Sequence, residues 1–204
     1  MKVKICGIKD EFTLKYILSH SHPPKFIGMI LNYSKSPRNI SLELAKKLTS
    51  IKNKCEYVAV LVAPTIDFLN LIQNINFSYW QIYDLEPSEI ANIKKKYQKK
   101  IITALTIKNK DDVKKYKLYK NFSDIILFDS KGYEKSKSFN HSLLNSVPNS
   151  IKKMIAGNIQ INDIPSFKNS SYIIDVSGAL EESKGVKDIN KIDKFLNKVH
   201  NVNS

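Results

Sequence analysis

Residues 57–72, YVAVLVAPTIDFLNLI, join a short apolar run to a segment with helical spacing. The valine-rich run Tyr57–Val62 predicts a buried strand, and Thr65 is placed to begin a helix directly after it. The same order of strand and then helix recurs along the chain at a spacing of roughly 20 to 30 residues. Alternation of this kind is typical of α/β proteins with a parallel sheet covered by helices.

About eight such units account for the chain. We expect strands at Val3–Ile8, Phe26–Leu31, Tyr57–Val62, Phe77–Tyr83, Ile101–Leu105, Asp124–Phe128, Lys153–Ala156 and Tyr172–Val176. We expect helices at Glu11–Ser19, from Ser41, from Thr65, at Pro87–Lys96, at Lys110–Tyr119, near Phe139–Asn145, after Asn158 and at Asp188–Val199. Eight units predict a single, compact (β/α)8 TIM barrel over residues 1–204 with few insertions. The alternative is an open doubly wound sheet, but no GxGxxG follows any strand.

Composition limits the classes of function. The formal net charge is +14, but lysine is spread along the whole chain and so indicates solvated helix faces rather than a nucleic-acid surface. A positive field of this kind would still attract a phosphorylated substrate. The sequence contains no apolar run of about 18 residues and begins MKVKICGIKD, which turns polar at once. We therefore expect a cytoplasmic protein that binds neither membrane nor nucleic acid.

Reacting groups of such barrels come from the C-terminal ends of the strands. The first strand ends on Cys6, whose thiol could act as a base, although a small core residue is the alternative. Asp129 follows four apolar residues, which could raise its pKa and make it an acid, or it could be a loop carboxylate. Arg38 could bind a substrate carboxylate or be a surface arginine. Gly157 and Gly178 follow the last two strands, where backbone amides often hold a phosphate.

Other candidates are weaker. The histidines are interpreted as structural or solvent-exposed, because none is placed at a strand end: His20, His22, His141 and His200. Cys55 precedes its strand and is expected at the opposite end of the barrel, and with Cys6 it fits no metal spacing and no disulfide framework. Trp80 is expected to pack, whereas Tyr83 could pack or line the site. No cluster has the spacing of a metal site, so we expect no metal.

Several motifs together resemble the phosphoribosylanthranilate isomerase family of tryptophan biosynthesis over essentially the whole chain. They are KICG (4–7), KSPRNIS (35–41), WQIYDLE (80–86), LFD (127–129), AGNI (156–159), DVSGALE (175–181) and GVKD (185–188). KICG and KSPRNIS in register are the specific part of the resemblance.

The resemblance implies an aldose–ketose isomerase that needs no cofactor. It would convert N-(5-phosphoribosyl)anthranilate to 1-(2-carboxyphenylamino)-1-deoxyribulose 5-phosphate by an Amadori rearrangement. Cys6 would be the base, Asp129 the acid, and Arg38 the partner of the anthranilate carboxylate. The remaining substrate-binding residues would be Gln81 and Asp175, with Gly157, Asn158, Ser177 and Gly178 near the phosphate. The partner would be this small phosphorylated molecule, and the protein would be a monomer or homodimer.

The sequence also departs from the family pattern. The glycine-rich stretch after the sixth strand reads YEKSKSFNH here, with Tyr133, Glu134, Lys135 and Ser136 replacing glycines of a possible lid. Asn158 replaces a glycine but tolerates positive φ, and Tyr83 replaces the usual histidine of the fourth strand. A degenerate, non-catalytic barrel, a basic anion-binding or nucleic-acid-binding barrel, and another phosphosugar enzyme are the alternatives.

Overall fold

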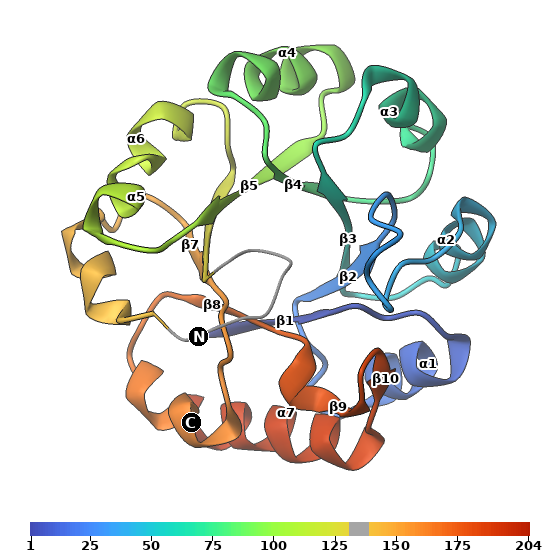
Figure 1. Ribbon diagram of the computed structural model, residues 1–204. Helices are drawn as coiled ribbons and strands as arrows, with labels where there is room; N and C mark the ends of the chain where they lie inside the picture. The colour runs from blue at the N-terminus through green and yellow to red at the C-terminus, as the bar shows by residue number, and fades with distance from the viewer. Residues whose placement is uncertain (131–138) are drawn as a thin grey trace.

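The computed structural model describes residues 1–130 and 139–204. Within these ranges eight parallel strands close into a barrel in the order of the sequence, and helices surround them (Figure 1). The strands are β1 (Lys2–Cys6), β2 (Phe26–Ile30), β3 (Glu56–Val62), β4 (Tyr79–Tyr83), β5 (Lys100–Thr106), β6 (Ile125–Asp129), β7 (Lys153–Ile155) and β8 (Ile173–Val176). The prediction of a (β/α)8 barrel is confirmed.

The helices begin where the sequence offers capping side chains. Ser41 accepts a hydrogen bond from the Leu44 amide, and Thr65 accepts one from the Phe68 amide, which satisfies amides that have no partner within the helix. The α-helices are α1 (Glu11–Ser19), α2 (Leu42–Thr49), α3 (Ile66–Ile72), α4 (Pro87–Tyr97), α5 (Lys110–Lys114), α6 (Tyr116–Tyr119) and α7 (Ile189–Asn203). Three 3-10 helices complete the ring: η1 (His141–Ser146), η2 (Ile161–Phe167) and η3 (Gly178–Leu180).

The structure differs from the sequence-based expectation mainly in its helices and in one hairpin. The helix expected at Lys110–Tyr119 is divided into α5 and α6 at Lys115. The helices expected near Phe139 and after Asn158 are 3-10 helices, and η2 contains Pro165, which cannot donate a backbone hydrogen bond. The last helix continues to Asn203. A short hairpin, β9 (Glu181–Ser183) and β10 (Val186–Lys187), lies between β8 and α7, where no strand was expected.

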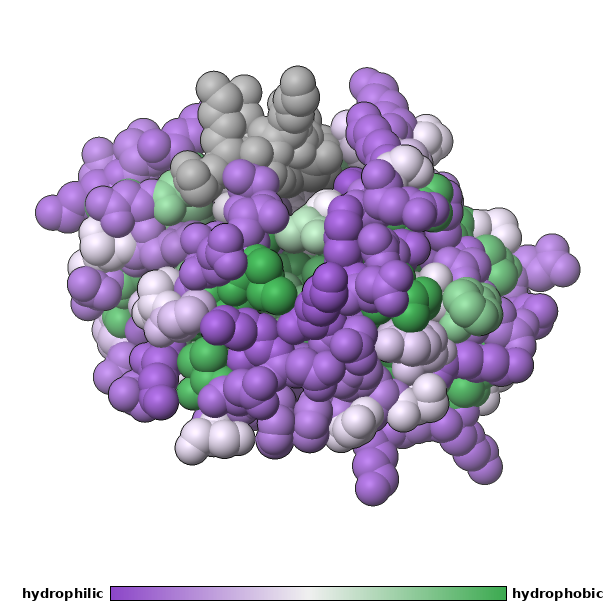
Figure 2. All heavy atoms as spheres, turned by 90° about the horizontal axis from the view of Figure 1, so that it is seen from below, coloured by the Kyte–Doolittle hydropathy of each residue, from purple (hydrophilic) through white to green (hydrophobic). Residues whose placement is uncertain are grey.

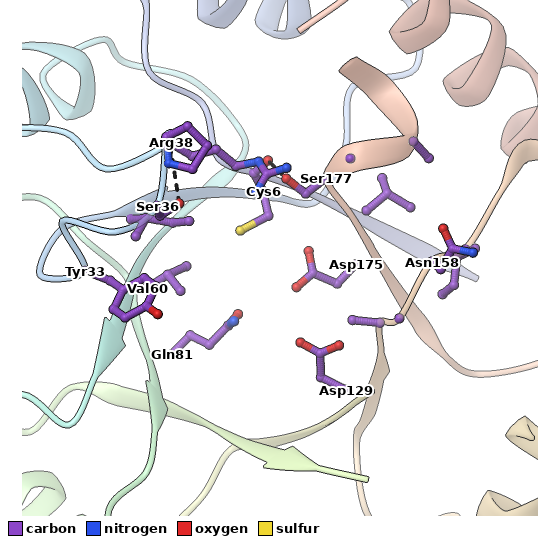
Figure 3. A pocket seen from close by; sticks show the side chains of 18 of the residues that line it. Cys6, Tyr33, Ser36, Arg38, Val60, Gln81, Asp129, Asn158, Asp175 and Ser177 are labelled. Atoms are coloured by element: carbon purple, nitrogen blue, oxygen red, sulfur yellow. Dashed lines mark hydrogen bonds between the residues drawn. The ribbon is translucent and has the colours of Figure 1, made fainter. Parts of the chain in front are cut away.

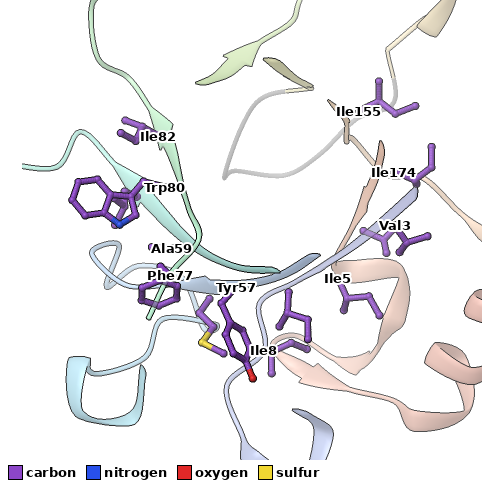
Figure 4. Close-up of a cluster of buried hydrophobic side chains, with 14 of the residues drawn as sticks. Val3, Ile5, Ile8, Tyr57, Ala59, Phe77, Trp80, Ile82, Ile155 and Ile174 are labelled. Carbon is purple, nitrogen blue, oxygen red and sulfur yellow. The ribbon is translucent and has the colours of Figure 1, made fainter. Parts of the chain in front are cut away.

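The barrel wall separates two apolar layers. Because side chains alternate along a strand, Val3 and Ile5 of β1 pack outward against the helices, whereas Lys4 and Cys6 point into the barrel. Figure 4 shows part of the outer layer, in which Val3 and Ile5 lie near Ile174. Trp80 is fully buried in this layer, so it packs as expected. The alternation therefore decides which residues of each strand can reach the site.

The end of the barrel opposite the strand C-termini carries a separate group of residues. Cys55 lines a cavity there with His22 and His200, whose rings stack with their centroids 3.6 Å apart. The molecular surface around α7 is largely hydrophilic, and its hydrophobic groups are small and scattered (Figure 2). No helix among the described residues is long and apolar enough to span a membrane.

Candidate active site

A cavity of about 640 Å³ opens at the C-terminal ends of the strands. Every residue that the sequence suggested for the site lines it: Cys6, Arg38, Gln81, Asp129, Gly157, Asn158, Asp175, Ser177 and Gly178. In Figure 3 the side chains of Cys6, Gln81, Asp129 and Asp175 point into the same opening from different strands. The structure thus brings together residues that are far apart in the sequence, such as Cys6 and Gly178, which are separated by 172 positions. The loop 130–138 was expected as a possible lid, and its residues 131–138 lie outside the described residues.

The Cys6 thiol lies beside the ammonium group of Lys4, two residues earlier on the same inner face of β1. Cys6 pairs in register with Gly28 of β2, and a Cβ on Gly28 would lie 2.9 Å from the sulfur and 3.0 Å from Lys4 Nζ. The missing side chain of Gly28 therefore leaves the space that both groups occupy. Burial raises the pKa of the Cys6 thiol, and the positive charge of Lys4 opposes this effect by favouring the thiolate.

Lys4 is fully buried and makes an ion pair with Asp175. Its Nζ lies 2.8 Å from Asp175 Oδ2, and the two residues are directly paired in the β1–β8 register. Burial lowers the pKa of Lys4, but the charges and hydrogen bonds of Asp175 and Cys6 together outweigh this effect, so the net direction is upward and the ammonium is retained. The other carboxylate oxygen, Oδ1, has no hydrogen-bond partner among the described residues and belongs to a residue that lines the cavity.

Asp129 is a buried carboxyl group suited to donate a proton. Burial raises its pKa to about 8, although a hydrogen bond from Tyr83 opposes the increase. Tyr83 Oη donates to Asp129 Oδ2 at 3.0 Å, and Gln81 Nε2 donates to Tyr83 Oη at 3.2 Å. A carboxyl group with this pKa is protonated at neutral pH, as a general acid must be.

Arg38 does not extend freely into the cavity. Its Nε and Nη2 donate to the two carboxylate oxygens of Glu181 in β9, at 2.6 and 2.8 Å. Glu181 also accepts from Lys187 Nζ at 2.8 Å and from the Gly185 amide at 3.0 Å. The hairpin therefore fixes the guanidinium at the cavity wall through two parallel hydrogen bonds. The remaining N–H groups of Arg38 are those that could contact a substrate carboxylate.

The turns after β7 and β8 line the part of the cavity expected to hold phosphate. Gly157 and Asn158 have φ of +106° and +55°, so Asn158 adopts a left-handed conformation that favours glycine and that asparagine tolerates better than most residues. Ser177 Oγ donates to the Cys6 carbonyl at 3.0 Å, which ties this turn to the end of β1. The lysines that line the same cavity add positive charge: Lys35, Lys184 and Lys191.

Among the described residues, no group of three or more histidines, cysteines or carboxylates could hold a metal ion. The groups gathered at the strand ends are instead a thiol next to a cation, a protonated carboxyl group and two anion-compatible turns. Such a set suits proton transfer on an anionic substrate.

The family model described as N-(5'phosphoribosyl)anthranilate (PRA) isomerase matches residues 3–198. The chain belongs to this family. Relatives named N-(5'-phosphoribosyl)anthranilate isomerase include one from Campylobacter jejuni, 33% identical over 96% of this chain and 97% of its own. Another, from Rhizobium johnstonii, is 31% identical over 99% of this chain and 95% of its own. The family resemblance found in the sequence is therefore confirmed.

Solved phosphoribosylanthranilate isomerases have the same fold. One from Thermotoga maritima has a TM-score of 0.85 at 24% identity and covers 98% of this chain and 99% of its own. Another structure of such an isomerase, with a TM-score of 0.83 at 23% identity over 98% of this chain and 99% of its own, contains reduced 1-(o-carboxyphenylamino)-1-deoxyribulose 5-phosphate.

The structure adds site residues that the sequence did not suggest. Lys4 and Lys187 are buried cations on the Cys6 side of the cavity, and Glu181 fixes Arg38. Lys4 could have been found from the alternation of MKVKIC, because a residue two positions before an inward-facing cysteine must also face inward. Tyr83, for which the sequence allows either packing or a place in the site, lines the cavity and contacts Asp129.

Proposed function

We propose that this phosphoribosylanthranilate isomerase family member catalyses the Amadori rearrangement of N-(5'-phosphoribosyl)anthranilate to 1-(2-carboxyphenylamino)-1-deoxyribulose 5-phosphate. The observation that carries the proposal is the pair formed by Cys6 and Asp129. A thiol flanked by cations and a carboxyl group with a pKa of about 8 line one cavity from different strands. A protonated carboxyl group can act as an acid, and the cations beside the thiol oppose the effect of burial and favour the thiolate, which can act as a base on the same substrate.

In the first step Asp129 donates its proton to the ring oxygen of the ribose. The bond between C1 and that oxygen breaks, and the nitrogen lone pair forms the C1=N bond of a protonated Schiff base. Its positive charge increases the acidity of the C2 proton, which the Cys6 thiolate removes. The electrons of that C–H bond form a C1=C2 double bond and neutralise the nitrogen, giving an enolamine.

The enolamine then tautomerises to the ketone. It loses its C2 hydroxyl proton and gains a proton at C1, so Asp129 can recover a proton and Cys6 can release one. Every step is a proton transfer or a shift of electron pairs within the substrate, so we propose an aldose–ketose isomerase that requires no cofactor. Arg38 would bind the anthranilate carboxylate with the N–H groups that Glu181 does not occupy, and the turns at Gly157 and Gly178 would bind the phosphate.

The direct test uses purified protein and freshly prepared N-(5'-phosphoribosyl)anthranilate. Formation of the product is followed by NMR through the appearance of its C1 methylene protons and C2 ketone carbon. The matched control is Cys55→Ser, which alters the other cysteine, at the far end of the barrel. We expect turnover by the wild type and by Cys55→Ser, and a loss of at least about 100-fold in Cys6→Ser. Absence of turnover in the wild type would refute the proposed function.

A further inference from the structure

A chain of buried hydrogen bonds runs from Gln81 through Tyr83 to Asp129. Gln81 and Tyr83 lie two residues apart on β4, so both point into the barrel, and Asp129 ends β6. The three residues are 1%, 5% and 5% exposed. The chain ends on Asp129 Oδ2, whereas Oδ1 of the same carboxyl group is buried and has no hydrogen-bond partner among the described residues.

The chain has a fixed direction. The amide nitrogen of Gln81 can only donate, so the oxygen of Tyr83 accepts from it. Tyr83 Oη donates to Asp129 Oδ2, which acts as an acceptor. A protonated carboxyl group whose Oδ2 accepts a hydrogen bond carries its own proton on Oδ1. That oxygen has no hydrogen-bond partner among the described residues, and Asp129 lines the cavity.

We propose that Tyr83 is a positioning residue that holds the acidic proton of Asp129 on Oδ1, directed at the substrate. The proposal rests on the proposed function, because it assigns Asp129 as the acid.

The surroundings keep Tyr83 in its donor form. Burial raises the pKa of Tyr83 well above its ordinary value, and the charge of Asp129 adds to this effect, so the phenol remains protonated throughout the working range. The groups that act on Asp129 come from four elements: Tyr83 of β4, Lys4 of β1, Asp175 of β8, and the Ser130 amide after β6. Cys6 of β1 lines the same cavity. Of these, the Tyr83 hydrogen bond is the strongest that favours the ionised form.

The test is Tyr83→Phe, which removes the hydroxyl group and keeps the ring. We expect kcat to fall about 10-fold with KM changed less than about threefold, because the hydrogen bond orients the acid rather than binding the substrate. The inflection near pH 8 that Asp129 contributes to the profile of kcat/KM should move to higher pH, since the bond that lowers its pKa is gone. Gln81→Met, which leaves Tyr83 in place but frees its proton to rotate, should lower kcat by a smaller factor.

The matched control is Tyr79→Phe. It removes the same hydroxyl from the same face of β4, at the end remote from Asp129, and should leave kcat and the inflection unchanged. The decisive comparison is made in an Asp129→Asn background, where adding Tyr83→Phe should change the residual rate less than about twofold. Three results would each overturn the proposal: an unchanged kcat, a rise in KM alone, or an equal fall in kcat in the Asp129→Asn background.

A measurement without substrate separates this inference from the proposed function. The Asp129 carboxyl carbon is titrated by NMR in protein labelled with carbon-13 at aspartate, and Asp129→Asn identifies its signal. Tyr83→Phe should raise the pKa of Asp129 above about 8 even if the wild type shows no isomerase turnover. An inactive wild type with this shift refutes the function alone. A titration unchanged by Tyr83→Phe refutes the hydrogen-bond assignment alone.

Discussion

Replacing Glu181 with glutamine tests whether the hairpin after β8 holds the site together by charge. Burial raises the pKa of Glu181, but hydrogen bonds from Arg38 and the charge of Lys187 outweigh it and lower the pKa from 4.5 to about 2. A difference of about 2.5 pKa units corresponds to about 3 kcal/mol of free energy of unfolding at pH 7. The side chain is only 5% exposed, so solvent screens little of this interaction.

The sign of the effect is set by the lowered pKa. Above pH 4.5 the carboxylate is charged in both the folded and unfolded protein, and its full stabilisation is present. As the pH falls, the unfolded state takes up a proton first, and roughly 1.4 kcal/mol is lost by pH 3.5. Glutamine does not titrate, so we expect Glu181→Gln to unfold about 3 kcal/mol more easily at pH 7 but only about 2 kcal/mol more easily at pH 3.5.

Urea unfolding followed by circular dichroism at the two pH values measures both differences. The control is Glu182→Gln, because Glu182 is adjacent and exposed, and its substitution should change the free energy of unfolding by less than about 0.5 kcal/mol. A penalty for Glu181→Gln that is the same at both pH values, or below about 0.5 kcal/mol at pH 7, would show that the charge of Glu181 does not stabilise the folded protein.

The remaining predictions concern the groups that face the cavity. Cys6→Ser should lower kcat at least about 100-fold in the NMR assay, because a hydroxyl is a far weaker source of base than a thiol. Asp129→Asn should lower kcat by a similar factor. The same variant should be more stable, with a free energy of unfolding, measured by urea unfolding at pH 7, that is higher by roughly 2–4 kcal/mol. In the wild type the raised pKa of Asp129 means that its carboxyl group ionises from about pH 4 upward in the unfolded state but not in the folded state. The wild type therefore loses stability as the pH rises toward 8, and the asparagine variant does not. Gly28→Ala should lower kcat about 10-fold or more with less than about 2 kcal/mol of destabilisation, because its Cβ displaces two side-chain ends, Cys6 Sγ and Lys4 Nζ, rather than backbone. Retention of wild-type kcat by Gly28→Ala would show that the spacing of these two groups is unimportant.

The barrel could be predicted because the pattern of an apolar strand followed by a helix is repeated along the sequence. Each strand is a short run of β-branched and apolar residues, and several helices begin at Ser or Thr caps that the sequence displays openly, such as Ser41 and Thr65. The expected secondary structure is wrong where a segment is short or lacks the regular spacing of apolar residues that marks a helix or strand. The segment after Asn158 contains Pro165, which leads to a 3-10 helix, and the hairpin at 181–187 is too short and too polar to produce a strand signal.

For the cavity, the sequence allowed us to predict which residues at the strand ends line it, but not how these residues contact one another. Cys6, Asp129 and Gly178 could be placed because the C-terminal ends of parallel strands meet at one face of a barrel. The pairing of Arg38 with Glu181 was not visible, because it joins positions 143 residues apart through a hairpin that the sequence did not predict. Tyr83 could be assigned only once β4 and β6 were placed, since its contact crosses from one strand to another.

The distribution of charge distinguishes the environments of the proposed base and the proposed acid. Burial raises the pKa of both Cys6 and Asp129, which favours a proton donor and opposes a base. Lys4 and Lys187 counter this effect at Cys6, whereas the strongest group countering it at Asp129 is the neutral Tyr83 hydroxyl. The two cations are in turn held by Asp175 and Glu181 rather than by substrate. The buried surroundings of the thiol and of the carboxyl group therefore differ, with cations beside Cys6 and a neutral hydroxyl group beside Asp129. Exchanging the proposed roles of these two groups would require moving the buried lysines as well as the two side chains.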